Sequence, residues 1–271
     1  MCIMSRTTSA DGTPIAYELH GAAGAPAVIF VHGAIATRQL QPAPAAIAEL
    51  TGLRVVEYDR RGRGESGDTL PYAVDREIED IAALIEVVGG HGWLLGESSG
   101  ATLALEAARA GQPVDGLLLY EPPIVADDGR PPVPADYTER LDALLAEGRR
   151  DAAFAQFSIE GVGLPPEMVG DVTASPYWPV VEPIAHTLAY DARVCGDTMS
   201  GSPAPLRRFA AVDTDATIVV GTQSLPYMRA GAHALAAALP KARVVELADA
   251  GHQVQAATLS PVLRETVGGT R

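Results

Sequence analysis

The sequence predicts an α/β fold: a doubly wound, mostly parallel eight-stranded sheet with an inserted helical lid. Three observations predict it. Short, nearly continuous apolar runs recur along the chain, as in strands that are buried on both faces. Helical patterns separate many of these runs, an order that places helices on both faces of a parallel sheet. One long stretch, residues 126–205, interrupts the alternation.

The first two predicted strands form a hairpin, because residues 6–9 and 14–19 flank Asp11-Gly12, a tight-turn signal. The later strands are the apolar runs, which cover residues 27–31, 53–58, 92–95, 114–120, 216–220 and 242–247. Helical patterns cover residues 78–88, 101–110 and 229–238. We expect each strand-helix-strand crossover to be right-handed.

Residues 126–205 contain no convincing strand, and prolines punctuate them in a way that suits helix starts and tight connections. Helical patterns cover residues 137–147, 152–157, 166–173 and 179–194. We therefore predict a helical lid over 126–205, inserted into a core domain made of residues 1–125 and 206–271. The aromatic side chains of this lid predict an apolar substrate; they are Phe154, Phe157, Tyr177, Trp178, His186 and Tyr190.

Composition narrows the class of protein. A formal net charge of −14 argues against nucleic acid or an anionic membrane as partner, because both attract basic surfaces. The N-terminal residues lack a signal-peptide core and no apolar run approaches the ~20 residues that span a bilayer, so we expect a cytoplasmic protein. Cys2 and Cys195 are too few for a disulfide framework or a metal site, and we expect Cys195 to be a small buried residue.

Residues 96–100, Gly-Glu-Ser-Ser-Gly, follow an apolar run and open a helical pattern. In a G-x-S-x-G turn the serine backbone is strained, and the two glycines let strand and helix cross closely. The turn lifts the Ser98 hydroxyl above the sheet edge and aims the Ser99 N–H at a developing oxyanion. Ser98 is therefore the predicted nucleophile. It needs a general base, and His252, in a glycine-containing loop after the last strand, is the strongest candidate.

Four motifs, in this order, resemble those of the α/β-hydrolase superfamily, in its lidded, cofactor-free serine hydrolase branch. They are His32-Gly33-Ala34, Asp59-Arg60-Arg61-Gly62-Arg63-Gly64-Glu65-Ser66, the turn around Ser98, and Ala250-Gly251-His252. The resemblance covers residues 14–265. It implies that the Ala34 N–H joins that of Ser99 in the oxyanion hole, that His252 is the catalytic base, and that no metal or cofactor takes part.

The sequence departs from this family where the triad acid is expected. Most relatives place an aspartate after the strand at 216–220, but no carboxylate stands there in this chain. In some lidded relatives the acid follows the strand at 114–120, where this chain has Glu121. We predict that Glu121 orients His252, because a carboxylate at that strand end lies on the functional edge of the sheet. The lesser candidates are Asp191, Asp197 and Asp249.

A serine nucleophile attacks a carbonyl through a tetrahedral intermediate, which makes acyl transfer the predicted reaction class. The sequence thus predicts a serine hydrolase of the carboxylic ester hydrolase type, cleaving an ester, lactone or thioester of a small apolar substrate through an acyl-enzyme. The predicted pocket residues are His32, Phe154, Phe157, Trp178, His186 and Leu225.

Three alternatives stay open at this point. Similar serine sites on this fold cleave carbon–carbon bonds of diketones. A non-hydrolytic cyclase or a ligand-binding protein of the same fold is a second alternative, because the expected acid is missing. A perhydrolase or haloperoxidase-like side activity is the third. The sequence also leaves open the natural substrate, the oligomeric state, any lid movement, and the role of Glu97 beside the nucleophile.

Overall fold

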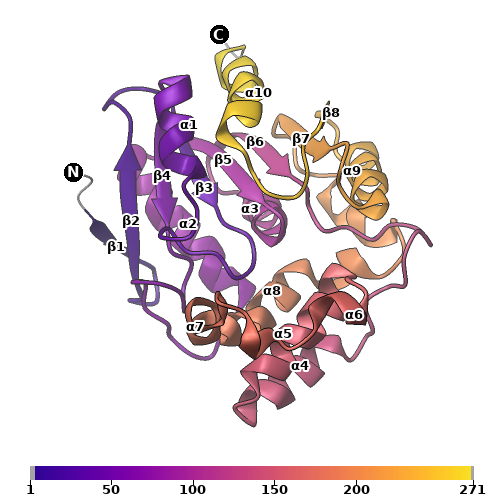
Figure 1. The fold of residues 1–271 in the computed structure, drawn as a ribbon. Coiled ribbons are helices and arrows are strands. Elements are labelled where there is room, and N and C mark those ends of the chain that lie inside the picture. The colour runs from indigo at the N-terminus through magenta and orange to yellow at the C-terminus, as the bar shows by residue number, and fades with distance from the viewer. Residues whose placement is uncertain (1–3, 270–271) are drawn as a thin grey trace.

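The computed structural model describes residues 4–269, which contain an eight-stranded sheet in the order β1-β2-β4-β3-β5-β6-β7-β8 (Figure 1). Strands β1 and β2 form the predicted antiparallel hairpin, and β2 also pairs antiparallel with β4. All other pairs are parallel. The strands are β1 (Ser5–Thr8), β2 (Pro14–His20), β3 (Ala27–Val31), β4 (Arg54–Tyr58), β5 (Gly92–Glu97), β6 (Val114–Tyr120), β7 (Ala216–Gly221) and β8 (Ala242–Leu247). The predicted mostly parallel sheet is confirmed.

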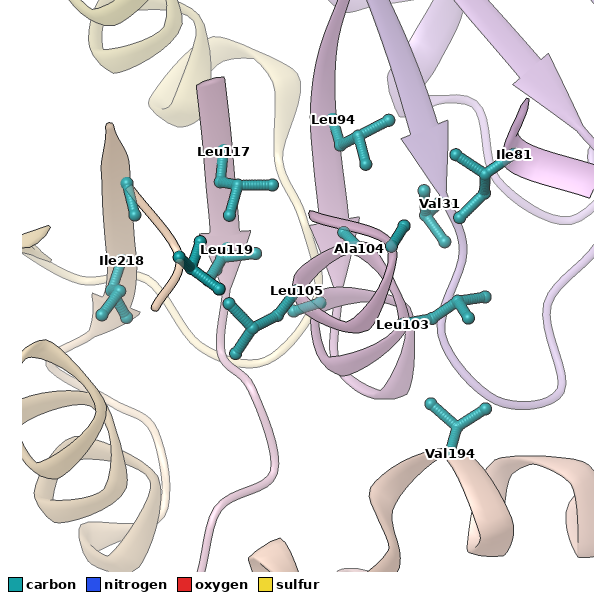
Figure 2. Close-up of a cluster of buried hydrophobic side chains, with 14 of the residues drawn as sticks. Val31, Ile81, Leu94, Leu103, Ala104, Leu105, Leu117, Leu119, Val194 and Ile218 are labelled. Carbon is teal, nitrogen blue, oxygen red and sulfur yellow. The ribbon is translucent and has the colours of Figure 1, made fainter. Parts of the chain in front are cut away.

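Two apolar cores lie on opposite faces of this sheet, because successive side chains of a strand point to opposite sides. Val28 and Phe30 of β3 pack with helices α1 (Ala43–Thr51) and α10 (Ala256–Gly268). Ile29 and Val31 belong to the second core, which Figure 2 shows around α3. The helices on that face are α2 (Val74–Val88), α3 (Ser99–Arg109) and α9 (Pro226–Ala238). The sheet is therefore covered on both faces, as predicted.

Helices α1 and α10 were not among the predicted helices, and for α10 an internal proline explains why. Pro44 lies in the first turn of α1, and Pro261 lies inside α10, where a proline removes a backbone hydrogen bond and normally interrupts a helix. Burial of Ile47, Leu259 and Leu263 against the sheet stabilises both helices nevertheless. Tertiary packing thus overrides the local signal.

Between β6 and β7 the chain forms short helices that gather at one end of the sheet (Figure 1). They are α4 (Tyr137–Ala146), α5 (Arg150–Gln156), α6 (Pro166–Val169), α7 (Trp178–Val181) and α8 (Leu188–Cys195), with a π-helical turn (Phe157–Val162) and 3-10 turns at Val172–Ala174, Glu182–Thr187, Gly196–Met199 and Ala204–Phe209. We call residues 126–205 the helical segment. Its boundaries as a domain and its role as a lid stay predictions.

Two predicted helices of the helical segment are shorter in the structure than the sequence pattern indicates. The helix expected over 166–173 ends before Gly170, and the one expected over 179–194 is divided into three pieces near Pro183. Helix α8 nevertheless packs on the main core, where Val194 lies beside α3 (Figure 2). The end of the helical segment is therefore joined to the sheet by apolar contacts.

Within residues 4–269, no helix combines the length and apolar character needed to cross a bilayer. Cys195 is buried, as predicted, whereas Cys2 lies outside the described residues. The cytoplasmic location and the absence of nucleic-acid and membrane partners stay predictions.

Candidate active site

Ser98 lies between β5 and α3 with φ 54° and ψ −124°, a backbone conformation that residues other than glycine rarely adopt. A Cβ atom on Gly96 would lie 2.4 Å from the Gly100 carbonyl oxygen, and one on Gly100 would lie 2.1 Å from that of Val31. Both positions therefore require glycine. The strained strand-turn-helix predicted from the sequence is the geometry of the structure, and strain of this kind is concentrated at functional sites.

The structure brings His252 and Glu121 together. Nδ1 of His252 lies 2.7 Å from Oε2 of Glu121, although the two residues are far apart in the sequence. The other carboxylate oxygen accepts hydrogen bonds from the Gly221 N–H, at 2.8 Å, and from the Ser224 hydroxyl. The Tyr120 hydroxyl donates to the Gly251 carbonyl at 2.5 Å, which holds the loop next to His252. Both ends of the Glu121–His252 pair are thus fixed by neighbouring strands.

Glu121 and His252 differ in exposure. The Glu121 side chain is fully buried, whereas 46% of the His252 side chain is exposed. Burial alone would raise the pKa of the Glu121 carboxyl, but the hydrogen bonds from His252, Ser224 and the Gly221 N–H hold that pKa below its ordinary value. An ionised Glu121 favours the proton on Nδ1 of the imidazole, which leaves Nε2 as the basic nitrogen.

A cavity of about 590 Å³ borders Ser98 and His252 as well as Ala34 and Ser99, the predicted oxyanion-hole residues. Most of its other walls are apolar; they include Pro132, Val133, Phe157, Val162, Met199 and Met228. The charged side chains in its walls are the acidic Asp191 and Asp197. The arrangement suits a small, neutral, apolar ligand next to a serine and an imidazole.

Among the six predicted pocket residues, Phe157 borders this cavity. Phe154 and Trp178 instead line a second cavity of about 450 Å³ in the helical segment, with their ring centroids 6.0 Å apart in an edge-to-face contact. This corrects the expectation that they shape the pocket at Ser98. The reason is that the side chains of Phe154, on α5, and Trp178, on α7, contact each other within the helical segment.

The other three predicted pocket residues also lie elsewhere, since none of them is among the described residues that border the cavity. The His32 side chain is fully buried, and its Nε2 lies 3.4 Å from Oε1 of Glu57. His186 lies 3.5 Å from Asp68, and Leu225 is a partly exposed residue just before α9. His32 is therefore a buried residue that packs beside Glu57 and does not border the cavity.

Sequence reasoning missed several residues of the cavity wall. Tyr227 and Met228 lie in the first turn of the helix after β7, at the carboxyl end of the sheet where α/β ligand sites occur, and this position was the available signal. Tyr137 of α4 carried no comparable signal. Asp191, a lesser candidate for the acid, pairs with Arg60 and Arg63 instead of His252.

Glu97 precedes the nucleophile, and its side chain is buried behind the turn. The amide nitrogen of Gln41 lies 3.5 Å from its carboxylate, and the Val254 N–H also donates to it. Burial raises the pKa of the Glu97 carboxyl above its ordinary value, although these bonds and the nearby His32 and His252 oppose that shift. Glu97 therefore links the turn to the loop that follows His252.

Comparison with known proteins places these features in a family. The model of the Alpha/beta hydrolase family matches residues 28–263. The chain is 46% identical to an alpha/beta hydrolase from Sphaerobacter thermophilus DSM 20745, with a TM-score of 0.87 over 97% of this chain and 100% of that one. A thermophilic esterase from Thermogutta terrifontis shares the fold at 23% identity, with a TM-score of 0.69 over 99% and 98% of the two chains.

A curated relative is similar over a shorter range. The chain is 33% identical over 99 residues to the bifunctional esterase/perhydrolase DCH of Acinetobacter calcoaceticus. This alignment spans 36% of each protein.

Proposed function

Because the chain belongs to the alpha/beta hydrolase family, we propose that it is a serine hydrolase that cleaves an ester, lactone or thioester of a small, neutral, apolar substrate through an acyl-enzyme. The observation that carries the proposal is the 2.7 Å contact between His252 Nδ1 and Glu121 Oε2, beside a cavity that His252 shares with Ser98. A serine hydroxyl needs such a base to act as a nucleophile near neutral pH.

In the acylation half-reaction, Nε2 of His252 removes the proton from the Ser98 hydroxyl while Oγ forms a bond to the substrate carbonyl carbon. The Glu121 carboxylate stabilises the imidazolium that results. The N–H groups of Ala34 and Ser99 donate to the oxyanion, and Ser99 is the first residue of α3, where the helix dipole adds to the stabilisation. The tetrahedral intermediate collapses, and His252 protonates the leaving oxygen or sulfur.

Deacylation repeats these steps with water. His252 removes a proton from a water molecule, whose oxygen attacks the acyl carbon and forms a second oxyanion. The bond to Oγ then breaks, and the proton on His252 returns to Ser98. The His252 imidazole suits this exchange, because its side chain is partly exposed to solvent water.

The cavity supports the substrate class. Its apolar walls favour a neutral acyl group of modest size, because placing a charged group among apolar side chains costs free energy. We further propose that the helical segment, residues 126–205, is the lid of this site and divides the core as predicted. Phe157, Val162 and Met199 of the cavity wall come from it, which supports that role.

Perhydrolysis is a second candidate, favoured by the similarity to the bifunctional esterase/perhydrolase of Acinetobacter calcoaceticus. In that reaction hydrogen peroxide takes the place of water and attacks the acyl-enzyme. His252 removes a proton from the peroxide, and the oxygen that lost it bonds to the acyl carbon. The bond to Ser98 Oγ then breaks, His252 returns the proton to Oγ, and a peroxy acid is released. The same serine and imidazole serve both acceptors.

A fluorophosphonate probe, followed by mass spectrometry of the intact protein, tests the proposal. We expect one adduct on the wild-type protein and none on Ser98→Ala. In a separate assay, the unlabelled wild-type protein should hydrolyse p-nitrophenyl esters with short acyl chains. A folded wild-type protein that forms no adduct would contradict the proposal and favour a non-hydrolytic cyclase or a ligand-binding protein. Assays with a diketone and with added peroxide separate carbon–carbon cleavage and perhydrolysis from ester hydrolysis.

A further inference from the structure

The peptide unit between Gly33 and Ala34 has a second partner besides the predicted oxyanion. Nη1 of Arg63 donates to the Gly33 carbonyl oxygen at 2.6 Å. This peptide is trans, so its carbonyl and its N–H point in opposite directions. A guanidinium that fixes the carbonyl of Gly33 therefore also fixes the direction of the Ala34 N–H. A charged donor on the carbonyl also polarises the amide, which strengthens the N–H as a hydrogen-bond donor.

Arg63 is itself held from the helical segment. Its Nη2 donates to Oδ2 of Asp191 at 2.7 Å, and its Nε donates to the Thr187 hydroxyl at 3.0 Å. Only 1% of the Arg63 side chain is exposed. With a separate acceptor at each of its three nitrogens, the guanidinium has one orientation, and two of the acceptors come from residues that follow β6.

Asp191 connects the same residues to the other predicted oxyanion donor. Its Oδ1 accepts a hydrogen bond from the Ser99 hydroxyl at 2.7 Å and another from Nη1 of Arg60 at 2.7 Å. Arg60 in turn donates to the His32 carbonyl oxygen at 3.2 Å. One buried carboxylate on α8 is therefore bonded to Ser99 directly and to the Gly33 carbonyl through Arg63.

The His32-Gly33-Ala34 turn, which we call the oxyanion turn, also lies close to the nucleophile. A Cβ atom on Gly33 would lie 3.0 Å from Cβ of Ser98 and 3.1 Å from the Glu97 carbonyl oxygen. A small rotation of the Gly33–Ala34 peptide would thus change the position of its N–H relative to the reacting carbon. Buried ion pairs add little net stability compared with apolar side chains, but their bonds are directional, which is what this position needs.

We propose that Arg63 and Asp191 are positioning residues, which orient the Ala34 and Ser99 N–H groups toward the oxyanion and so make the geometry of the oxyanion hole depend on helix α8. This inference rests on the proposed serine hydrolase function. Arg60 and Arg63 occupy the variable positions of the Asp59–Ser66 motif, so the role belongs to this chain's own residues and not to the motif in general.

The test compares Arg63→Met with Arg61→Met. Arg61 is a matched control because it is equally buried on the same turn, but its guanidinium bonds to Asp80 and Asp11, away from the oxyanion turn. We would measure kcat and KM for p-nitrophenyl butyrate, the inhibition constant of a trifluoromethyl ketone, which forms an oxyanion on the serine, and Tm.

We expect Arg63→Met to lower kcat about 10- to 100-fold and to leave KM within about threefold of wild type. The inhibition constant of the trifluoromethyl ketone should rise by a factor similar to the loss in kcat. Arg61→Met should lower Tm and leave kcat within about twofold. Because Arg63→Met can prevent folding, Asp191→Asn is measured as well. It keeps a carbonyl oxygen and should give a smaller loss of the same kind.

Two results would overturn the positioning role while the esterase activity stands. One is an equal effect of Arg61→Met and Arg63→Met on kcat, and the other is a fall in kcat/KM of Arg63→Met that comes from a higher KM. A folded wild-type protein without esterase activity would instead overturn the proposed function, and the positioning role with it.

Discussion

Two buried polar clusters flank Ser98, and they differ in their access to water. In the Glu121–His252 pair, a fully buried carboxylate holds an imidazole whose side chain is 46% exposed. We use the term arginine network for Arg60, Arg63, Glu77 and Asp191 together with the separate Arg61–Asp80 pair on the same turn. None of these side chains is more than 2% exposed. One cluster contains an imidazole that is partly exposed to solvent, whereas the side chains of the other are buried.

The difference separates two uses of buried charge. A group that moves protons must reach the substrate and water during each cycle, as the imidazole of His252 does. A group that only holds its neighbours gains from exclusion of water, because hydrogen bonds between charged groups strengthen in a low dielectric. Loss of a residue from the Glu121–His252 pair should thus impair catalysis, and loss of one from the Arg61–Asp80 part of the network should impair folding.

Ser98→Ala should have the largest effect. Without the nucleophile no acyl-enzyme forms, and we expect kcat for p-nitrophenyl butyrate to fall by on the order of 10⁴-fold or more. Tm should stay within a few degrees, because the hydroxyl makes few contacts. Residual activity above one-tenth of wild type would place the chemistry at another residue.

Glu121→Gln should come next. The amide is nearly isosteric, but it lacks the charge that stabilises the imidazolium and it does not favour the proton on Nδ1 of His252. We expect kcat to fall by about 10²- to 10⁴-fold with little change in KM. Asp249→Asn is a suitable control, since Asp249 is an exposed carboxylate in the loop that carries His252. Similar losses in both variants would show that charge near the loop matters, and not the Glu121–His252 contact.

Asp80→Asn should have the opposite result to the two preceding variants, a loss of stability without a loss of kcat. Asp80 accepts two hydrogen bonds from Arg61, at 2.8 and 2.7 Å, and its replacement removes the more deeply buried of the two carboxylates that pair with this guanidinium, the other being Asp11. We expect the free energy of unfolding in urea to fall by about 3–5 kcal/mol. The kcat of the folded fraction should be unchanged. A drop in kcat without a loss of stability would mean that the whole arginine network serves the reaction.

Glu97→Gln should have the smallest effect, and a pH-dependent one. Because burial raises the pKa of the Glu97 carboxyl in the folded state, the folded protein holds that proton more tightly than the unfolded chain. The resulting stability is present below pH 4.5 and is lost as the pH rises through the raised pKa. Glutamine does not ionise, so the variant should be more stable than wild type at pH 7.5.

Urea unfolding of both proteins at pH 4 and pH 7.5 measures this difference. At pH 4 the two proteins should have nearly equal free energies of unfolding. A variant that is less stable at pH 7.5 would show that the ionised carboxylate is needed to hold the Val254 N–H.

The sequence alone determined the mostly parallel sheet, the turn at Ser98, and the three residues to which the proposed reaction is assigned, Ser98, His252 and Glu121. Buried strands are recognisable because they are short runs of apolar residues, and the turn because only glycine fits its two close approaches. Glu121 is predicted from the resemblance to lidded relatives whose acid follows this strand, and its place at the carboxyl end of β6, on the functional edge of the sheet, supports that choice.

Only the tertiary structure decided the lining of the cavity, the helical course of residues 256–268 around Pro261, and the partners of Arg60, Arg61 and Arg63. Arg63 and Asp191 are 128 residues apart, and nothing in the local pattern of either predicts that they meet. The physical reason is that periodicity indicates which face of an element is buried but not what it packs against. That choice depends on the packing of whole elements, and here it places a carboxylate from α8 beside Arg63, whose guanidinium donates to the Gly33 carbonyl.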